Sequence, residues 1–170
     1  QLLPISYYGI VILVALASGL AGVIFNWGLL NIGRFYSLPC FKRPVQKIAF
    51  ALICAGILGY FLPEVLGGGN DLINHLAKAP VSLQLLLIFL AGKLIFTLIS
   101  YGCGVPGGFF LPMLVIGALC GSICAQMLIM LGWIEPAYAT NIMVVAMAAL
   151  FASSVRAPIT GTVLIMEMTA

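Results

Sequence analysis

The sequence predicts an all-α membrane protein with tilted and broken transmembrane helices. Of its 170 residues, 64% are hydrophobic and only 6% are charged, whereas a soluble domain carries about 25% charged residues. Several apolar segments reach the roughly 20 residues that a helix needs to cross a bilayer. Two later segments are short and are separated by an Arg-Ala-Pro sequence, a pattern typical of helices that break inside a membrane.

Charge and cysteine content exclude several other classes of protein. The net charge of +3 does not indicate a nucleic-acid partner, because the basic residues are few and several cluster in one loop. The odd cysteine count argues against a complete disulfide framework. No cysteine pair has C-x-x-C spacing, so the cysteines are interpreted as small buried apolar residues: Cys40, Cys54, Cys103, Cys120 and Cys124. The first residues show no signal peptide, and the missing initiator Met indicates a fragment or a trimmed chain.

The first two apolar segments flank a basic loop. Ile5–Ile32 exceeds the spanning length and should therefore tilt. It carries two pairs of small residues that would let another helix approach closely: Ala15 with Gly19, and Ser18 with Gly22. The loop holds four basic residues and no acidic one: Arg34, Lys42, Arg43 and Lys47. By the positive-inside rule it should be cytoplasmic, and contact with lipid headgroups is the alternative role. The second segment is Ile48–Leu62.

A polar stretch precedes the third spanning segment. Gly67–Asn70 is a turn with wide backbone freedom, and the amphipathic Asp71–Lys78 is expected to form a surface or re-entrant helix on the outer side. It contains the single histidine, His75, which has no second ligand nearby and is interpreted as interfacial, with no metal bound. Val81–Ser100 is interrupted by Lys93. We expect a structural, snorkelling or paired lysine in preference to one on an ion path.

A Gly/Pro-rich loop then leads into the apolar segment Phe109–Trp133. Pro112 suits the first turn of a helix, where its missing N–H has no effect. The preceding glycines, including Gly108, leave the approach to this helix start free of side chains. Unpaired N–H groups and the positive end of the helix dipole together form an anion site. No Lys, Arg or His lies between Tyr101 and Trp133, so the site would be uncharged.

The last two apolar segments are Asn141–Val155 and Pro158–Met168. Neither spans a bilayer comfortably alone, so broken helices that meet near the midplane are expected. Pro158 disfavours helical backbone at the residue before it, which predicts a break at Arg156-Ala157. Arg156 should then lie near an aqueous edge.

The residues that catalysis would require are missing. The four acidic residues are not neighbours, Gly-x-Ser-x-Gly is absent, and the single histidine lies in a polar piece. A Ser or Cys nucleophile needs a base within hydrogen-bond reach, so no enzyme activity is predicted. Two other functions remain open beside an anion transporter. One is a secondary transporter for another substrate, with a broken-helix substrate site, and the other is a membrane scaffold.

Three blocks of sequence also resemble one known family. Gly108-Phe109-Phe110-Leu111-Pro112 resembles the G-x-F-x-P signature of the CLC chloride channels and chloride/proton exchangers. Gly67–Asn70 with Leu72-Ile73 resembles the family's upstream glycine turn. Ala148–Gly161 with Glu167-Met168-Thr169 resembles its late helix pair. The blocks occur in the family's order and span most of the chain.

The resemblance implies a fold and a site. Residues 1–170 would be the C-terminal part of a CLC-type transmembrane domain, the second of two inverted repeats without its last helix. The function implied is that of a fragment of a voltage-gated-type chloride channel or chloride/proton antiporter. By resemblance, the backbone N–H groups of Phe109 and Phe110 bind the central anion, and Gly108 and Pro112 frame the site. No cofactor is implied apart from the transported chloride ion.

The resemblance also implies partners. CLC proteins are homodimers with one anion pathway in each subunit. The resemblance implies a multi-pass protein of the cell membrane, here the bacterial inner membrane. The missing N-terminal half would supply the other anion-binding loops, the gating glutamate and most dimer contacts. An anion-contacting tyrosine would follow Ala170. The sequence does not distinguish a channel from an exchanger, or chloride from nitrate or fluoride as the transported anion. It also leaves open whether a cytoplasmic regulatory domain follows.

The charge asymmetry between the loops generates a testable topology. A cysteine placed at Ser37 in a cysteine-free version of the intact protein should resist an impermeant thiol reagent added outside intact cells, because the basic loop is cytoplasmic. Permeabilised cells provide the control, in which the same cysteine should react. Prompt labelling from outside would reverse the topology.

Overall fold

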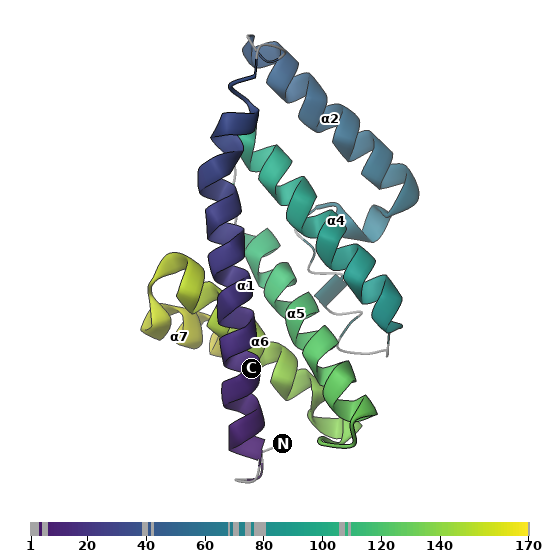
Figure 1. The fold of residues 1–170 in the computed structure, drawn as a ribbon, viewed down its shortest axis with the longest axis vertical. Helices are drawn as coiled ribbons and strands as arrows, with labels where there is room; N and C mark the ends of the chain where they lie inside the picture. Colours follow the sequence, from purple (N-terminus) through teal and green to yellow (C-terminus); the bar gives the residue numbers. More distant parts are fainter. Residues whose placement is uncertain are drawn as a thin grey trace.

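The computed structural model describes residues 4, 7–38, 41, 43–67, 69, 72–73, 76, 81–105, 108 and 110–169. In chain order the elements are α1 (Tyr8–Phe35), α2 (Pro44–Phe61), η3 (Pro63–Val65), α4 (Leu83–Gly102), α5 (Phe110–Met130), η4 (Pro136–Tyr138), α6 (Ala139–Val155) and α7 (Pro158–Thr169). These ranges contain helices and no strand (Figure 1). The predicted all-α fold is confirmed.

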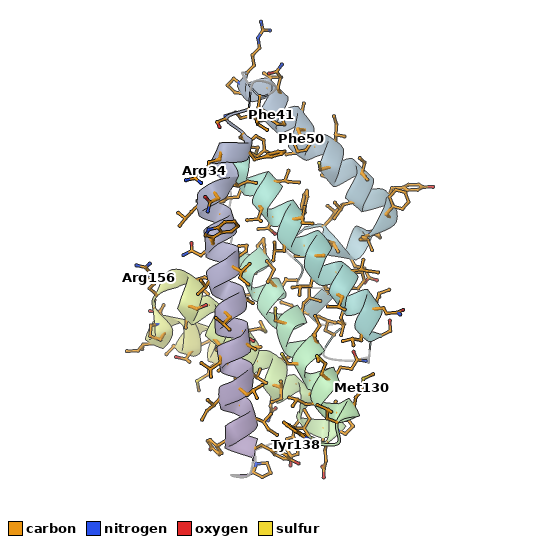
Figure 2. The ribbon with its side chains drawn as sticks, in the orientation of Figure 1. Arg34, Phe41, Phe50, Met130, Tyr138 and Arg156 are labelled. Atoms are coloured by element: carbon orange, nitrogen blue, oxygen red, sulfur yellow. The ribbon has the colours of Figure 1, made fainter. Side chains whose placement is uncertain are left out.

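Helix lengths match a membrane protein. Within the described ranges, α1, α2, α4, α5 and the stretch Pro136–Val155 are long and apolar enough to cross a bilayer. Helix α1 has 28 residues and is therefore about 42 Å long, more than the roughly 30 Å of bilayer hydrocarbon. Tilt accommodates such an excess, as the sequence predicted. Figure 2 places Arg34, Phe41 and Phe50 at one end of the structure, and Met130 and Tyr138 at the other.

Two predicted segments are longer than expected. Helix α2 begins at Pro44, where proline occupies the first turn and the Gln46 side chain accepts a 3.0 Å hydrogen bond from the Arg43 N–H. Helix α6 begins at Ala139 and continues η4, so that the two together reach 20 residues. The prediction that the segment Asn141–Val155 does not comfortably span a bilayer alone was therefore wrong, because Pro136 starts a helical turn that lengthens it to 20 residues. Helix α7, with 12 residues, is short as predicted.

Helix α5 lies at the centre of the core and packs antiparallel to α6. The start of α5 meets the end of α6 through Phe110 and Phe151. One face of α5 lets the backbones approach closely: a Cβ on Gly117 would lie 2.8 Å from the Met147 Cα atom, and one on Gly121 2.6 Å from the Met143 Cα atom. Small residues allow such contacts between membrane helices, so Gly117 and Gly121 are the residues through which α5 meets α6.

Helix α1 crosses the other side of α6. Ser18 and Gly22 are buried, and the Ser154 hydroxyl on α6 donates a 3.4 Å hydrogen bond to the Gly22 carbonyl. This small-residue pair therefore serves helix packing as predicted. Gly19 does not, since no atom of the described chain lies within 4 Å of a Cβ at that position.

The chain breaks between α6 and α7 as predicted. Arg156 has left-handed backbone with φ of +60° and donates its N–H to the Ala152 carbonyl at 3.0 Å, a geometry that commonly ends helices. Pro158 then begins α7. Arg156 is exposed in this chain, but Figure 2 shows it beside the middle of α1 and not at either end. The expected position near an aqueous edge stays a prediction, with which the exposure of the side chain agrees.

The glycine contact between α5 and α6 can be tested by one methyl group. Gly121→Ala in the intact protein should lower the free energy of unfolding by about 1–3 kcal/mol, because overpacking displaces the facing backbone. Gly19→Ala is the control, since its Cβ meets open space within this chain. Thermal unfolding in detergent measures both, and equal stability of the two variants would contradict the close contact.

Candidate functional site

The predicted anion site lies at the start of α5. This helix begins at Phe110, and Pro112 is its third residue, so the prediction that Pro112 occupies the first turn is confirmed. The start of α5 lies at about half the height of α1 (Figure 1). Gly108 is exposed, and no described atom lies within 4 Å of a Cβ built on it. Phe109 lies outside the described residues.

Backbone groups supply the chemistry of this site. The first four residues of an α-helix have no intrahelical acceptor for their N–H groups. In α5 this leaves donors on Phe110, Leu111 and Met113, since Pro112 has no N–H. The helix dipole adds about half a positive charge at the same end. No charged side chain occurs from Tyr101 to Trp133, so this attraction for an anion comes from the backbone.

Two further helix ends gather beside the start of α5. The half-buried Phe110 ring meets the Phe151 ring edge to face, with centroids 5.5 Å apart and planes at 80°. Phe151 also touches α7, where a Cβ on Gly161 would lie 2.5 Å from its Cδ1 atom. Phe151, at the end of α6, therefore lies between Phe110 and the first turn of α7. The Phe110 ring thus packs into the core and leaves the backbone to face the approach.

A buried tyrosine anchors the end of α4, where the loop that leads to the site begins. Tyr36, only 3% exposed, donates its hydroxyl to the Ile99 carbonyl at 2.8 Å. Its ring lies against Gly102, where a Cβ would come within 2.6 Å of the Tyr36 Cε2 atom. Gly104 then turns the chain with φ of +84°, a conformation that favours glycine. Sequence reasoning missed Tyr36, although the small Gly102 at the end of an apolar segment was a usable signal.

Lys93 has a structural environment. It is 1% exposed, and its Nζ atom donates hydrogen bonds of 2.8 Å to each of the carbonyls of Val65 and Gly67. The structural role expected for this residue is therefore confirmed, and the snorkelling alternative is excluded by its burial.

Comparison with known proteins shows the family of this chain. The family described as voltage gated chloride channel matches residues 1–170. The chain belongs to this family. Chloride-channel relatives include an H(+)/Cl(-) exchange transporter ClcA of Vibrio campbellii, 37% identical over 158 residues, which cover 89% of this chain and 33% of the relative. The corresponding transporter of Vibrio cholerae serotype O1 is 35% identical over 172 residues, 97% of this chain and 36% of the relative.

A solved structure of an antiporter has the same fold. The crystal structure of a slow cyanobacterial Cl-/H+ antiporter superposes with a TM-score of 0.87 at 28% identity, covering 99% of this chain and 40% of that chain. This chain thus spans about a third of the length of its curated relatives. With five helices of spanning length among its described residues, this member of the chloride channel family is a multi-pass membrane protein.

The described basic residues between α1 and α2 lie away from the site. Arg34 and Arg43 are exposed near the junction of α1 and α2, and Lys47 is half-buried there. His75 and Asp71 lie outside the described residues. Among the described residues, no three His, Cys, Asp or Glu side chains gather as a metal site.

Removing the Tyr36 hydroxyl tests the anchor of the loop. Tyr36→Phe should reduce the free energy of unfolding of the intact protein by about 1 kcal/mol, because a buried carbonyl loses its donor. Burial, then the nearby Cys103 and Cys54 thiols, raise the pKa of Tyr36 above its usual 10.0.

The sign of this pKa shift adds a pH readout. The folded state retains the phenolic proton longer than the unfolded state, so the difference between wild type and Tyr36→Phe should persist up to about pH 10 and shrink above it. Thermal unfolding against pH measures this, with Tyr60→Phe, an exposed tyrosine of α2, as the control. Equal effects of the two substitutions would contradict the anchoring role.

Proposed function

We propose that the intact protein is a chloride/proton exchanger of the bacterial inner membrane and that this chain supplies part of its anion pathway. The exchange activity is that of the relatives named above. The observation that carries the proposal is the uncharged start of α5 beside the middle part of α1. Transport, rather than catalysis, is the activity assigned to this chain, with chloride as cargo and no cofactor.

The anion binds to backbone amides at this helix start. The N–H groups of Phe109 and Phe110 act as donors, and Gly108 and Pro112 shape the approach. Phenyl ring faces repel negative charge, so the rings serve as walls and not as ligands through their faces. A site without a fixed cation binds chloride and still releases it, as transport requires. A formal positive charge at this depth is also expensive.

A complete pathway requires the rest of the protein. The proposed assignment is that residues 1–170 are the second inverted repeat without its last helix and that an N-terminal half supplies the remaining anion-binding groups. That this chain spans about a third of the length of its relatives supports it. Two copies of the complete protein form a homodimer, each with its own pathway. Family membership favours this assembly over an unrelated secondary transporter or a scaffold.

Backbone coordination predicts unequal effects of two neighbouring substitutions. In the full-length protein, Gly108→Pro should abolish saturable chloride binding, because proline removes an N–H and distorts the approach. Phe109→Leu should retain most of the binding, since it changes a ring and leaves the amide. Calorimetric titration of chloride into the purified protein measures both.

Gly108→Ala is the matched control for this experiment. It keeps the N–H, and its Cβ meets no described atom of this chain within 4 Å, so chloride affinity should change by less than about tenfold. Equal loss of binding in Gly108→Pro and Phe109→Leu, or full binding by Gly108→Pro, would place the site elsewhere.

A further inference from the structure

A buried lysine joins α4 to the glycine turn of this chain. The Lys93 ammonium donates hydrogen bonds of 2.8 Å to the carbonyls of Val65 and Gly67, 28 and 26 residues away in the sequence. Bonds from a charged donor are roughly twice as strong as neutral ones, and a low-dielectric interior strengthens them further. One side chain thus holds two positions of the turn against α4.

The two carbonyls need such a donor because of where they lie. Val65 ends the short helix η3, and Gly67 has left-handed backbone with φ of +68°. The last carbonyls of a helix have no N–H donor within the helix, and unpaired polar groups inside a membrane protein are costly. Lys93 donates to both and therefore holds the chain from the end of η3 to Gly67 in place.

The other side of the same turn presses on α5. Gly69 is buried with φ of +82°, and a Cβ built on it would lie 2.5 Å from the Cγ2 atom of Val115. Val115 belongs to a buried cluster that also contains Val65 and, from α4, Phe89. It follows Phe110 by five residues, so the contact lies about 7.5 Å along the helix axis from the start of α5.

We propose that Lys93 is a positioning residue for the anion site. Through the carbonyls of Val65 and Gly67 it holds the glycine turn against Val115, and this contact fixes the second turn of α5. The first turn, which presents the anion-binding amides, is thereby held in place. The inference rests on the proposed function for the identity of the site, and requires no contact between Lys93 and the anion.

Three substitutions in the full-length protein test this role. Lys93→Met has a similar volume and no hydrogen-bond donor, whereas Lys93→Arg retains positive charge and donors. Thr97→Val is the matched control: this buried residue lies one turn further along α4, and its hydroxyl donates only to the Lys93 carbonyl of its own helix. Hydrogen–deuterium exchange of the amides of Val65 and Leu66, together with calorimetric chloride titration, provides two separate readouts.

Lys93→Met should accelerate exchange of both amides, because the turn loses its attachment to α4. It should also weaken chloride binding by about fivefold or more. Lys93→Arg should restore both quantities toward wild type, and Thr97→Val should leave both unchanged. Unchanged hydrogen–deuterium exchange of these amides in Lys93→Met would show that the lysine does not hold the turn. Faster exchange with wild-type chloride affinity would show that the turn does not act on the site.

The two readouts also separate this inference from the proposed function. Absence of saturable chloride binding by the wild-type protein would refute the proposed function and the positioning role with it. Hydrogen–deuterium exchange of the Val65 and Leu66 amides would still show whether Lys93 attaches the turn to α4. If Lys93→Met does not fold, Val115→Ala tests the link from α5: it should weaken chloride binding and leave exchange at Val65 and Leu66 unchanged. Wild-type affinity in Val115→Ala would overturn the proposal.

Discussion

The structure depends on the requirement that backbone polar groups inside a bilayer find partners. Long helices meet it internally, but three helix ends lie beside one another around Phe110, Phe151 and Gly161. The end of α6 is completed by the left-handed Arg156, whose N–H reaches the Ala152 carbonyl. The start of α5 instead presents N–H groups without an intrahelical acceptor. These N–H groups would be a defect in a simple helical bundle, and they are the donors on which the proposed anion site depends.

Much of this arrangement is readable from the sequence. Spanning length and sparse charge indicate membrane helices, and Pro158 indicates the break before α7. Gly117 and Gly121 predict a close helix contact because their spacing places both on one helix face. Pro112 predicts a helix start, and the Gly108–Pro112 motif points to the family. These signals are local, so a single sequence contains them.

Other features depend on contacts between distant segments, which local patterns do not encode. The partners of Lys93 are backbone carbonyls 26 and 28 residues away. Because every residue has a backbone carbonyl, the sequence does not indicate which ones accept the hydrogen bonds. The same holds for Tyr36, whose hydroxyl reaches the Ile99 carbonyl. The extension of α6 back to Pro136 was missed for a related reason: it depends on how the helix continues from the turn at Pro136.

The broken end of α6 also orients the chain within its surroundings. The exposed Arg156 lies beside the middle of α1 (Figure 2), and a guanidinium does not lose its charge in a protein. Hydrocarbon tails offer it no partner, so lipid cannot cover this face at that depth. The side of the chain that carries the junction of α6 and α7 must therefore turn toward the rest of the protein or a water-filled vestibule. A single arginine thus distinguishes the inner face of the chain from its lipid-facing surface.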